Sequence, residues 1–249
     1  MRSDISSVIL TMLKLKIENI VKFDFMDPPA PESMMRALET LNYLGALDDD
    51  GNLTEVGHQM AELPLDPQLS KALLSSVGFG CVPEMLTITA MLSIPPFFLR
   101  PKESAEEAEA VRATFGNPES DHIALLNVYD AFVQEKEEAR AEWCEEHFIN
   151  SRNLSNAVRV RSQLEGILQR LGIDVGAGGH VDDPFYFHNI RKCICSGFFM
   201  QVAIREKSGG YRMVKDNEVG VRCLLECRRW SCTSRARSAV SRSGCCSTV

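Results

Sequence analysis

Five polar side chains between positions 152 and 159 have the chemistry to bind the backbone of a nucleic acid. They are Arg152, Asn153, Ser155, Asn156 and Arg159. Guanidinium groups donate paired hydrogen bonds to phosphates, while hydroxyl and amide groups can bond to phosphates or ribose 2′-hydroxyls. Spacings of three, four and seven residues place all but Asn153 on one face of a helix over residues 150–161. The alternative is a solvated helix face that forms ordinary ion pairs with the many acidic residues of the chain.

A second basic pair, Arg191 and Lys192, precedes a segment with strand-like composition. These side chains could bind another phosphate, although basic residues at the end of a helix also interact favourably with its dipole. Just beyond them, Phe198 and Phe199 could stack on a base, as aromatic residues of nucleic-acid-binding barrels do. Successive residues of a strand point to opposite faces, so at least one belongs to the core, and we expect both to be core residues.

The sequence offers no metal site and no catalytic constellation. Its five histidines are His58, His122, His147, His180 and His188. None is paired with another histidine or with cysteine at the spacing of metal ligands. Five of the nine cysteines fall within the last 27 residues, without the paired Cys-x-x-Cys pattern of zinc modules. No Gly-x-Ser-x-Gly nucleophile motif occurs, so we expect no metal and no catalytic residue in this chain.

Composition limits how the chain could bind nucleic acid. Its 249 residues include 45% hydrophobic and 24% charged residues, as in folded soluble proteins, and its formal net charge is −7. That charge argues against binding through overall positive charge, so any contact with nucleic acid must be local. There is no run of about 18 apolar residues and no signal-peptide pattern at the N-terminus, which predicts a cytosolic or nuclear protein.

The elements that must position these residues begin with a small N-terminal domain. Apolar residues recur at helical spacing over residues 4–19, with Asp4 or Ser6 as a cap, and a proline-rich arm follows. Helical patterns at 31–44 and 55–63 flank a predicted hairpin with an Asp-Gly turn. This order of elements is typical of a winged-helix domain, which we assign to residues 1–66. The alternative is an ordinary helical hairpin whose connecting turn carries additional residues.

Residues 67–196 are predicted to form a helical bundle. Proline and glycine pairs separate its helices, which we place at 68–79, 83–93, 105–115, 121–131, 139–149, 154–171 and 184–195. Strand-like composition begins at 197–204, and a second strand is predicted at 211–214 after a Ser-Gly-Gly turn. Beyond Asn217 the chain is rich in Cys, Ser and Arg. It shows neither the alternation of a strand nor the periodicity of a helix, so we expect residues 218–249 to be a disordered tail.

Eight segments, in this order and spacing, resemble the C-terminal region of DEAH-box RNA helicases. They are residues 25–31 (FMDPPAP), 41–47 (LNYLGAL), 53–57 (LTEVG), 63–67 (LPLDP), 121–129 (DHIALLNVY), 189–192 (NIRK), 196–203 (SGFFMQVA) and 214–217 (VKDN). Each is weak alone, but together they span most of the chain up to Asn217. The resemblance is strongest to the pre-mRNA-splicing subfamily that disassembles spliceosomes and also acts in ribosome assembly.

The resemblance implies a mainly α fold. A winged helix would be followed by a helical domain called the ratchet (67–196) and by the start of an OB-fold β-barrel (197–217). In the family these domains pack on two motor domains and close an RNA channel, with the helix at 150–161 lining the path of single-stranded RNA. The implied partners are RNA, the motor domains, spliceosome components and activators that carry a glycine-rich G-patch. The implied compartment is the nucleus.

Two departures from the family separate this chain from an active helicase. Neither a Gly-x-x-x-x-Gly-Lys-Ser/Thr phosphate-binding loop nor an Asp-Glu-Ala-His box occurs, so nothing here can hold ATP or magnesium. These cofactors belong to the motor domains of the parent enzyme, and we expect no ATP hydrolysis by this chain alone. Family-like sequence also stops at Asn217, where the barrel should continue, which predicts an incomplete OB fold with unpaired edges.

Two other functions compete with an accessory part of an RNA helicase. The first is a protein-interaction scaffold whose acidic surface rejects nucleic acid. The second is a winged-helix DNA-binding protein, which we discount because the segment 32–44 offers only Arg36 as a basic side chain against phosphates.

Overall fold

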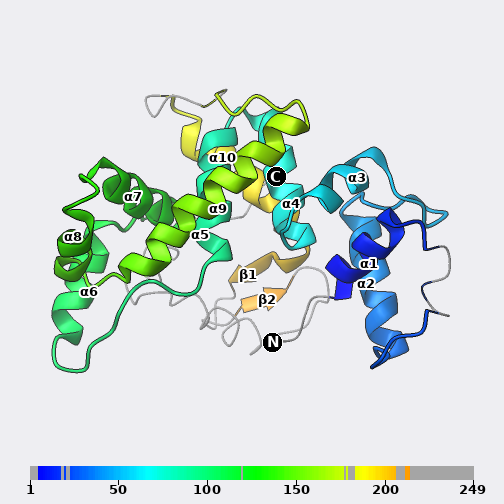
Figure 1. Ribbon diagram of the computed structural model, residues 1–249, viewed down its shortest axis with the longest axis horizontal. Coiled ribbons are helices and arrows are strands. Elements are labelled where there is room, and N and C mark those ends of the chain that lie inside the picture. The colour runs from blue at the N-terminus through cyan, green and yellow to red at the C-terminus, as the bar shows by residue number, and fades with distance from the viewer. Residues whose placement is uncertain are drawn as a thin grey trace. The chain divides into compact units, whose positions relative to one another are not determined.

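The computed structural model describes residues 5–17, 20, 23–118, 120–176, 178, 183–205 and 211–213. This part of the chain is mainly helical, as the sequence predicts (Figure 1). Its α-helices are α1 (Ile5–Lys14), α2 (Pro31–Tyr43), α3 (Glu55–Glu62), α4 (Pro67–Phe79), α5 (Val82–Ser93), α6 (Ala105–Thr114), α7 (Asp121–Gln134), α8 (Arg140–Glu146), α9 (Ser151–Arg170) and α10 (Tyr186–Phe198). A 3-10 helix follows at Phe199–Gln201, and two short strands are β1 (Ala203–Arg205) and β2 (Tyr211–Met213).

The chain divides into two compact units. The first contains residues 1–85 and 163–197, and the second contains residues 86–162 and 198–249. Helices α5 and α9 each contribute residues to both units. None of the helices in the described ranges combines the length and the apolar character needed to cross a membrane.

In the first unit, α1 packs against α2 and α3, in the order of helices predicted for the winged helix. Thr54 caps α3, because its side-chain oxygen accepts a hydrogen bond from the backbone nitrogen of Gly57 at 3.0 Å. The predicted hairpin is reduced to a single antiparallel bridge between Leu47 and Leu53. The Asp48 carboxylate closes its turn by accepting a hydrogen bond from the Asn52 backbone at 2.7 Å.

Close backbone packing in this unit depends on two glycines. A Cβ atom at Gly57 would overlap the carbonyl oxygen of Ala46, so only glycine allows α3 to approach the segment before the hairpin. At the other end of the unit, a Cβ at Gly197 would overlap the Gln68 carbonyl, where α10 crosses α4.

The buried thiol of Cys193, on α10, donates a hydrogen bond to the carbonyl oxygen of Ala72 at 3.0 Å. A hydrogen bond with the Cys81 thiol, together with burial, raises the pKa of Cys193 and keeps its thiol protonated.

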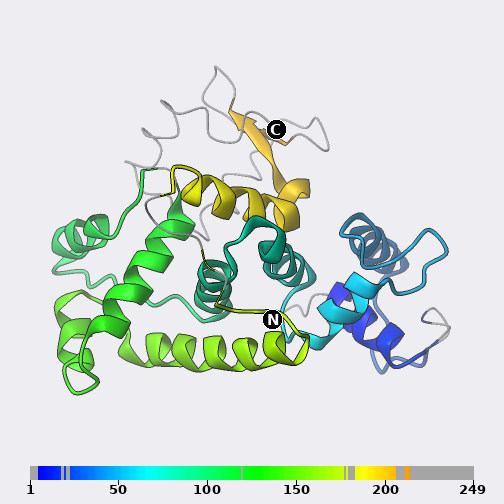
Figure 2. The same ribbon diagram turned by 90° about the horizontal axis from the view of Figure 1, so that it is seen from above.

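The second unit has an apolar core between α5, α7, α8 and the start of α9. Its members are Met91, Phe97, Val128, Tyr129, Phe132, Cys144, Ile149, Leu154 and Ala157. Figures 1 and 2 show α6, α7 and α8 gathered beside the N-terminal end of α9. An antiparallel bridge joins Phe98 to Ile149, and the Leu99 nitrogen donates to the Phe148 carbonyl at 2.8 Å. The loop after α5 is therefore fixed beside the start of α9.

Several predicted helix bounds are wrong. Helix α1 ends at Lys14 instead of continuing to residue 19, because Lys16 adopts a positive φ of 60° that breaks the helix. Ser6 is a buried residue inside α1 and not its cap, and Asp4 lies outside the described residues. Helix α8 ends at Glu146 because Phe148 has a φ of 54°, and Ile149 then joins the bridge. Helix α7 is longer than predicted and reaches Gln134.

The strand predicted at residues 197–204 is also largely wrong. Helix α10 continues to Phe198, the 3-10 helix reaches Gln201, and only Ala203–Arg205 is extended. It pairs antiparallel with Tyr211–Met213, which agrees with the predicted second strand. Phe199 is 43% exposed, so it is not the core residue we expected, and Phe198 is only partly buried. The rest of the predicted OB fold and the tail at 218–249 lie outside the described residues.

Candidate functional site

Helix α9 is built to present one side to solvent. Asn150 caps its start, because its side-chain oxygen accepts a hydrogen bond from the Asn153 backbone nitrogen at 3.2 Å. Leu154 and Ala157 are fully buried in the core of the second unit, and Val158 packs against that core. These apolar residues fix which side of the helix faces inward. The residues between them, at helical spacing, face outward.

Four of the predicted site residues lie together on the outward side. We call this group the polar face of α9, and its members are Arg152, Ser155, Asn156 and Arg159. Both arginines are exposed, and Ser155 and Asn156 are partly buried. Within the described part of the chain, no side-chain hydrogen bond or ion pair holds any of the four. The alternative of a face neutralised by acidic neighbours therefore finds no support among these residues.

Asn153 has a different role from the other four. Its side-chain amide donates to the Pro96 carbonyl at 2.9 Å and lies 3.5 Å from the Pro95 carbonyl. The Asn150 backbone nitrogen also donates to the Phe97 carbonyl at 2.8 Å. Asn153 thus ties the start of α9 to the loop after α5, and its amide hydrogens are already directed at protein atoms.

Arg161 was not among the predicted site residues, although it follows Arg159 by two positions. Its Nε donates to the hydroxyl oxygen of Thr87 on α5 at 3.0 Å, and its guanidinium carbon lies 6.0 Å from the centre of the Tyr129 ring on α7. Desolvation raises the pKa of the neighbouring Asp130 carboxyl, and the positive charge of Arg161 opposes that rise. The arginine is therefore directed into the second unit and not toward the polar face.

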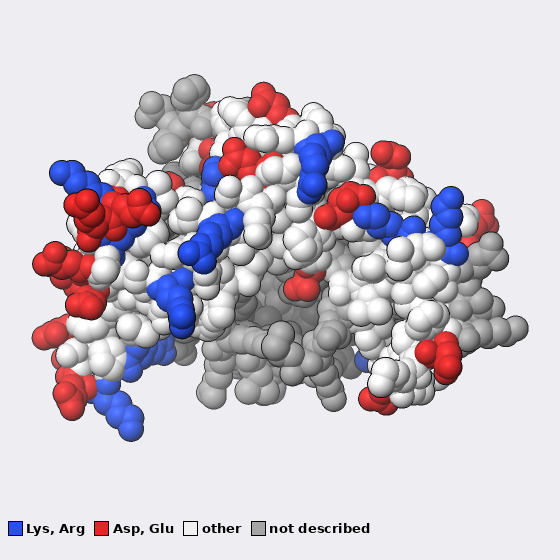
Figure 3. Space-filling view, viewed as in Figure 1, with Lys and Arg blue, Asp and Glu red and all other residues white. Residues whose placement is uncertain are grey.

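Charge is unevenly distributed over the second unit. In Figure 3, basic side chains follow the course of α9, whereas acidic side chains gather over α6, α7 and α8. The acidic set includes the exposed residues Glu106, Glu107, Glu142, Glu145 and Glu146. A polyanion would be repelled from the acidic end and attracted to the polar face. This separation of charge leaves a locally basic surface on a chain of net charge −7.

The second predicted pair belongs to the first unit. Arg191 and Lys192 lie near the middle of α10, where Lys192 is exposed and Arg191 is partly buried. The Arg191 Nε donates to the backbone carbonyl of Phe187, one turn earlier, at 3.3 Å. Because Arg191 is engaged within the protein, the pair offers a ligand fewer donors than the polar face of α9.

The contacts of His147 and the burial of His122 indicate structural roles for these two histidines. The His147 ring stacks on Trp143 at 4.3 Å between centres, and its Nδ1 lies 2.7 Å from the Trp143 carbonyl. Burial lowers the pKa of His122, with the Asp121 charge acting in the opposite direction. No group of three or more His, Cys, Asp or Glu side chains within the described ranges has the geometry to bind a metal ion. His180 lies outside those ranges.

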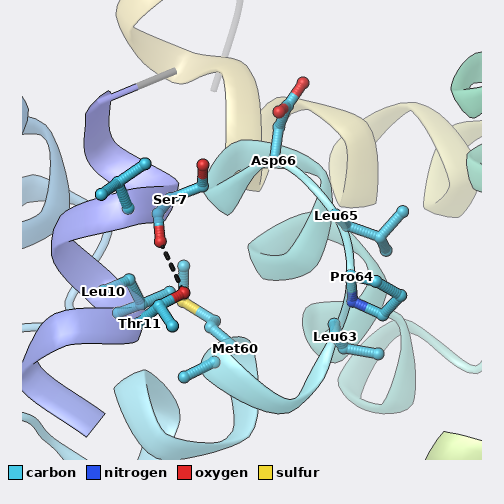
Figure 4. A pocket seen from close by; sticks show the side chains of 10 residues that line it. Ser7, Leu10, Thr11, Met60, Leu63, Pro64, Leu65 and Asp66 are labelled. Carbon is cyan, nitrogen blue, oxygen red and sulfur yellow. Dashed lines mark hydrogen bonds between the residues drawn. The ribbon is translucent and has the colours of Figure 1, made fainter. Parts of the chain in front are cut away.

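Sequence reasoning did not identify a pocket in the first unit. It has a volume of about 320 Å³, near the lower limit for small-ligand sites, and lies between α1 and the connection from α3 to α4. Figure 4 shows Leu10, Met60, Leu63 and Pro64 around it, with Ser7 and Thr11 on the α1 side. Thr11 donates its hydroxyl to the Ser7 carbonyl at 2.9 Å. Polar and apolar atoms share the surface of this pocket about equally.

Comparison with known protein families finds matches within the first two predicted domains. Residues 37–65 match the winged-helix part of the helicase-associated domain HA2, and residues 66–125 match its ratchet-like part. The first match covers α2, the hairpin and α3, and the second extends from α4 into α7. Helix α9 lies beyond both matched ranges. The chain thus contains the winged-helix and ratchet-like helicase-associated domains, which belong to the C-terminal region of DEAH-box helicases.

Proposed function

We propose that this chain is the accessory part of a DEAH-box RNA helicase that holds single-stranded RNA against the polar face of α9. The observation that carries the proposal is the exposure of Arg152 and Arg159 on one side of α9, while its opposite side is buried in the core. Helicase-associated domains occur in RNA helicases, and this makes RNA and the motor domains the expected partners.

The chemistry of the polar face favours contact with the RNA backbone over reading of bases. Guanidinium groups bind phosphates irrespective of sequence, and Ser155 and Asn156 between them can bond to ribose 2′-hydroxyls. Arg152 and Arg159 are seven residues apart, so about two helical turns, or roughly 10 Å, separate them along α9. That separation spans more than one nucleotide of an extended strand. The face therefore suits a channel wall along which RNA slides.

The finer assignments are part of the same proposal. The sequence resemblance supports a pre-mRNA-splicing helicase of the spliceosome-disassembly type that acts in the nucleus. In the parent enzyme, ATP and magnesium would bind to the motor domains, and the RNA channel would close between those domains and this part. The pocket beside α1 offers a place where a G-patch activator could dock on the winged helix.

The direct test measures binding of a fluorescent single-stranded RNA to the whole chain. Arg152→Glu/Arg159→Glu should weaken binding roughly a hundredfold, because two charge-assisted contacts are lost and replaced by repulsion. Lys16→Glu/Arg36→Glu is the matched control. It makes the same change in net charge on exposed residues of the winged helix.

Each outcome has a clear meaning. If the α9 variant loses affinity and the control keeps it, the polar face binds RNA. If both variants bind as the wild type does, the polar face does not contact RNA. The protein-interaction scaffold then becomes the better function. If only the control loses affinity, the winged helix carries the nucleic-acid contact and our proposal is wrong.

A further inference from the structure

Arg161 points away from the polar face, although it lies on the same helix. Each residue turns an α-helix by about 100°, so Arg161 projects about 200° around α9 from Arg159. Its Nε reaches the Thr87 hydroxyl at 3.0 Å, and its guanidinium lies over the Tyr129 ring at 6.0 Å. One side chain of α9 therefore contacts both α5 and α7.

The residues that make these two contacts with Arg161 are themselves firmly placed. Thr87 is 4% exposed and Tyr129 is 7% exposed, and Tyr129 belongs to the apolar core of the second unit. A guanidinium is planar and its donors have fixed directions, so contacts with both partners restrict rotation of α9 about its axis. The apolar contacts of Leu154 and Ala157 are less directional, because small rotations change them little.

A small rotation of α9 would matter for binding. The tips of its side chains lie about 5–6 Å from the helix axis, so a turn of roughly 20° moves them by about 2 Å. A hydrogen bond of about 2.9 Å does not survive a displacement of that size. The orientation of the helix thus decides whether Arg152 and Arg159 can reach the same RNA strand.

We propose that Arg161 is a positioning residue for RNA binding. Its contacts with Thr87 and Tyr129 set the rotation of α9 and so aim the polar face at the RNA backbone. This inference rests on the proposed function of that face. Arg161 itself makes no contact with RNA in this arrangement.

The test changes the buried partner and leaves α9 intact. Thr87→Val keeps the size of the side chain but removes the oxygen that accepts from Arg161, and Thr87→Ser retains that oxygen. RNA affinity should fall roughly tenfold in Thr87→Val and stay near the wild-type value in Thr87→Ser. Thr87 is buried and cannot touch RNA, so a loss of affinity has to act through α9.

A double-mutant cycle separates positioning from a purely structural role. Arg159→Gln should cost less affinity in the Thr87→Val background than in the wild type, because the arginine is already misplaced. The salt dependence of binding should also become shallower in Thr87→Val, as fewer phosphates are contacted. A purely structural role would lower the melting temperature and leave both RNA measurements unchanged. If Thr87→Val fails to fold, Arg161→Lys replaces it, because lysine keeps the charge but not the planar donors.

Two results would overturn the inference. One is wild-type RNA affinity in folded Thr87→Val or Arg161→Lys. The other is that the losses of RNA affinity in Arg161→Gln and Arg159→Gln add up in the double variant, while Thr87→Val leaves the affinity unchanged. That result would make Arg161 a direct phosphate contact. Both tests presume that Arg152→Glu/Arg159→Glu weakens RNA binding as the proposed function requires. If that variant binds RNA normally, the proposed function has failed, and the inference fails with it.

Discussion

The two sides of α9 differ in what they contribute to the protein. On the inner side, Leu154 and Ala157 are fully buried and hold the core of the second unit together. On the outer side, Arg152 and Arg159 are exposed and have no partner among the described residues. Exposed charges without partners contribute little to stability. The fold alone thus gives no reason for arginine at these two positions, whereas the proposed contact with RNA would give one.

The largest expected effect is on the inner side. Leu154→Ala should lower the free energy of unfolding by about 2–5 kcal/mol, because it leaves a cavity in a packed core. Arg152→Ala, two residues earlier, should change it by less than about 0.5 kcal/mol. Urea denaturation followed by circular dichroism gives both values. Equal losses in the two variants would mean that the outer side also supports the fold.

The next largest effect should distinguish RNA from DNA. Ser155→Ala/Asn156→Ala should weaken RNA binding roughly thirtyfold, because two neutral hydrogen bonds of about 1 kcal/mol each are lost. If these bonds go to 2′-hydroxyls, binding of a DNA strand with the same sequence should hardly change. Fluorescence anisotropy with both strands provides the measurement. An equal loss for RNA and DNA would place the two side chains on phosphates instead.

A smaller effect is expected for the basic pair on α10. Arg191→Gln/Lys192→Gln should weaken RNA binding only about threefold, because the Arg191 Nε is already bonded to the Phe187 carbonyl. The same RNA-binding assay applies, with Arg152→Gln/Arg159→Gln as the reference. A loss as large as that of the reference would show that α10 contributes equally to the binding surface.

The smallest effect concerns pH. Burial lowers the pKa of His122 below its usual 6.5, so the folded protein keeps this ring neutral. Below about pH 6.5 the unfolded chain gains a proton that the folded chain does not, and stability should fall as the pH decreases toward the folded pKa. Urea midpoints at pH 7.5 and 5.5 should differ less in His122→Gln than in the wild type. An identical pH dependence would mean that His122 does not contribute.

Local sequence signals predicted much of the fold. The Thr54 cap, the Asp-Gly turn and the proline and glycine breaks predicted the order and approximate positions of the helices. The 197–204 segment was misassigned because a short apolar run has no periodicity that separates helix from strand. What decides it is a tertiary contact, the close approach of Gly197 to α4, which no local pattern reveals.

The site was partly predictable for a similar reason. Helical spacing alone grouped the four residues of the polar face, because that face is a property of one helix. The inward direction of Arg161 and the bond from Asn153 to the Pro96 carbonyl depend on α5 and the loop after it. These elements are more than 50 residues away in the chain, so sequence spacing could not distinguish the two residues from their exposed neighbours.

The most direct test of our central claim is the salt dependence of RNA affinity for the wild type and for Arg152→Gln/Arg159→Gln. Each phosphate contact on a single strand contributes about 0.7 to the slope of log affinity against log salt concentration. Loss of two contacts should therefore reduce the slope by about 1.4 and leave the circular dichroism spectrum unchanged. An unchanged slope in the folded variant would contradict the claim that the polar face of α9 binds the RNA backbone.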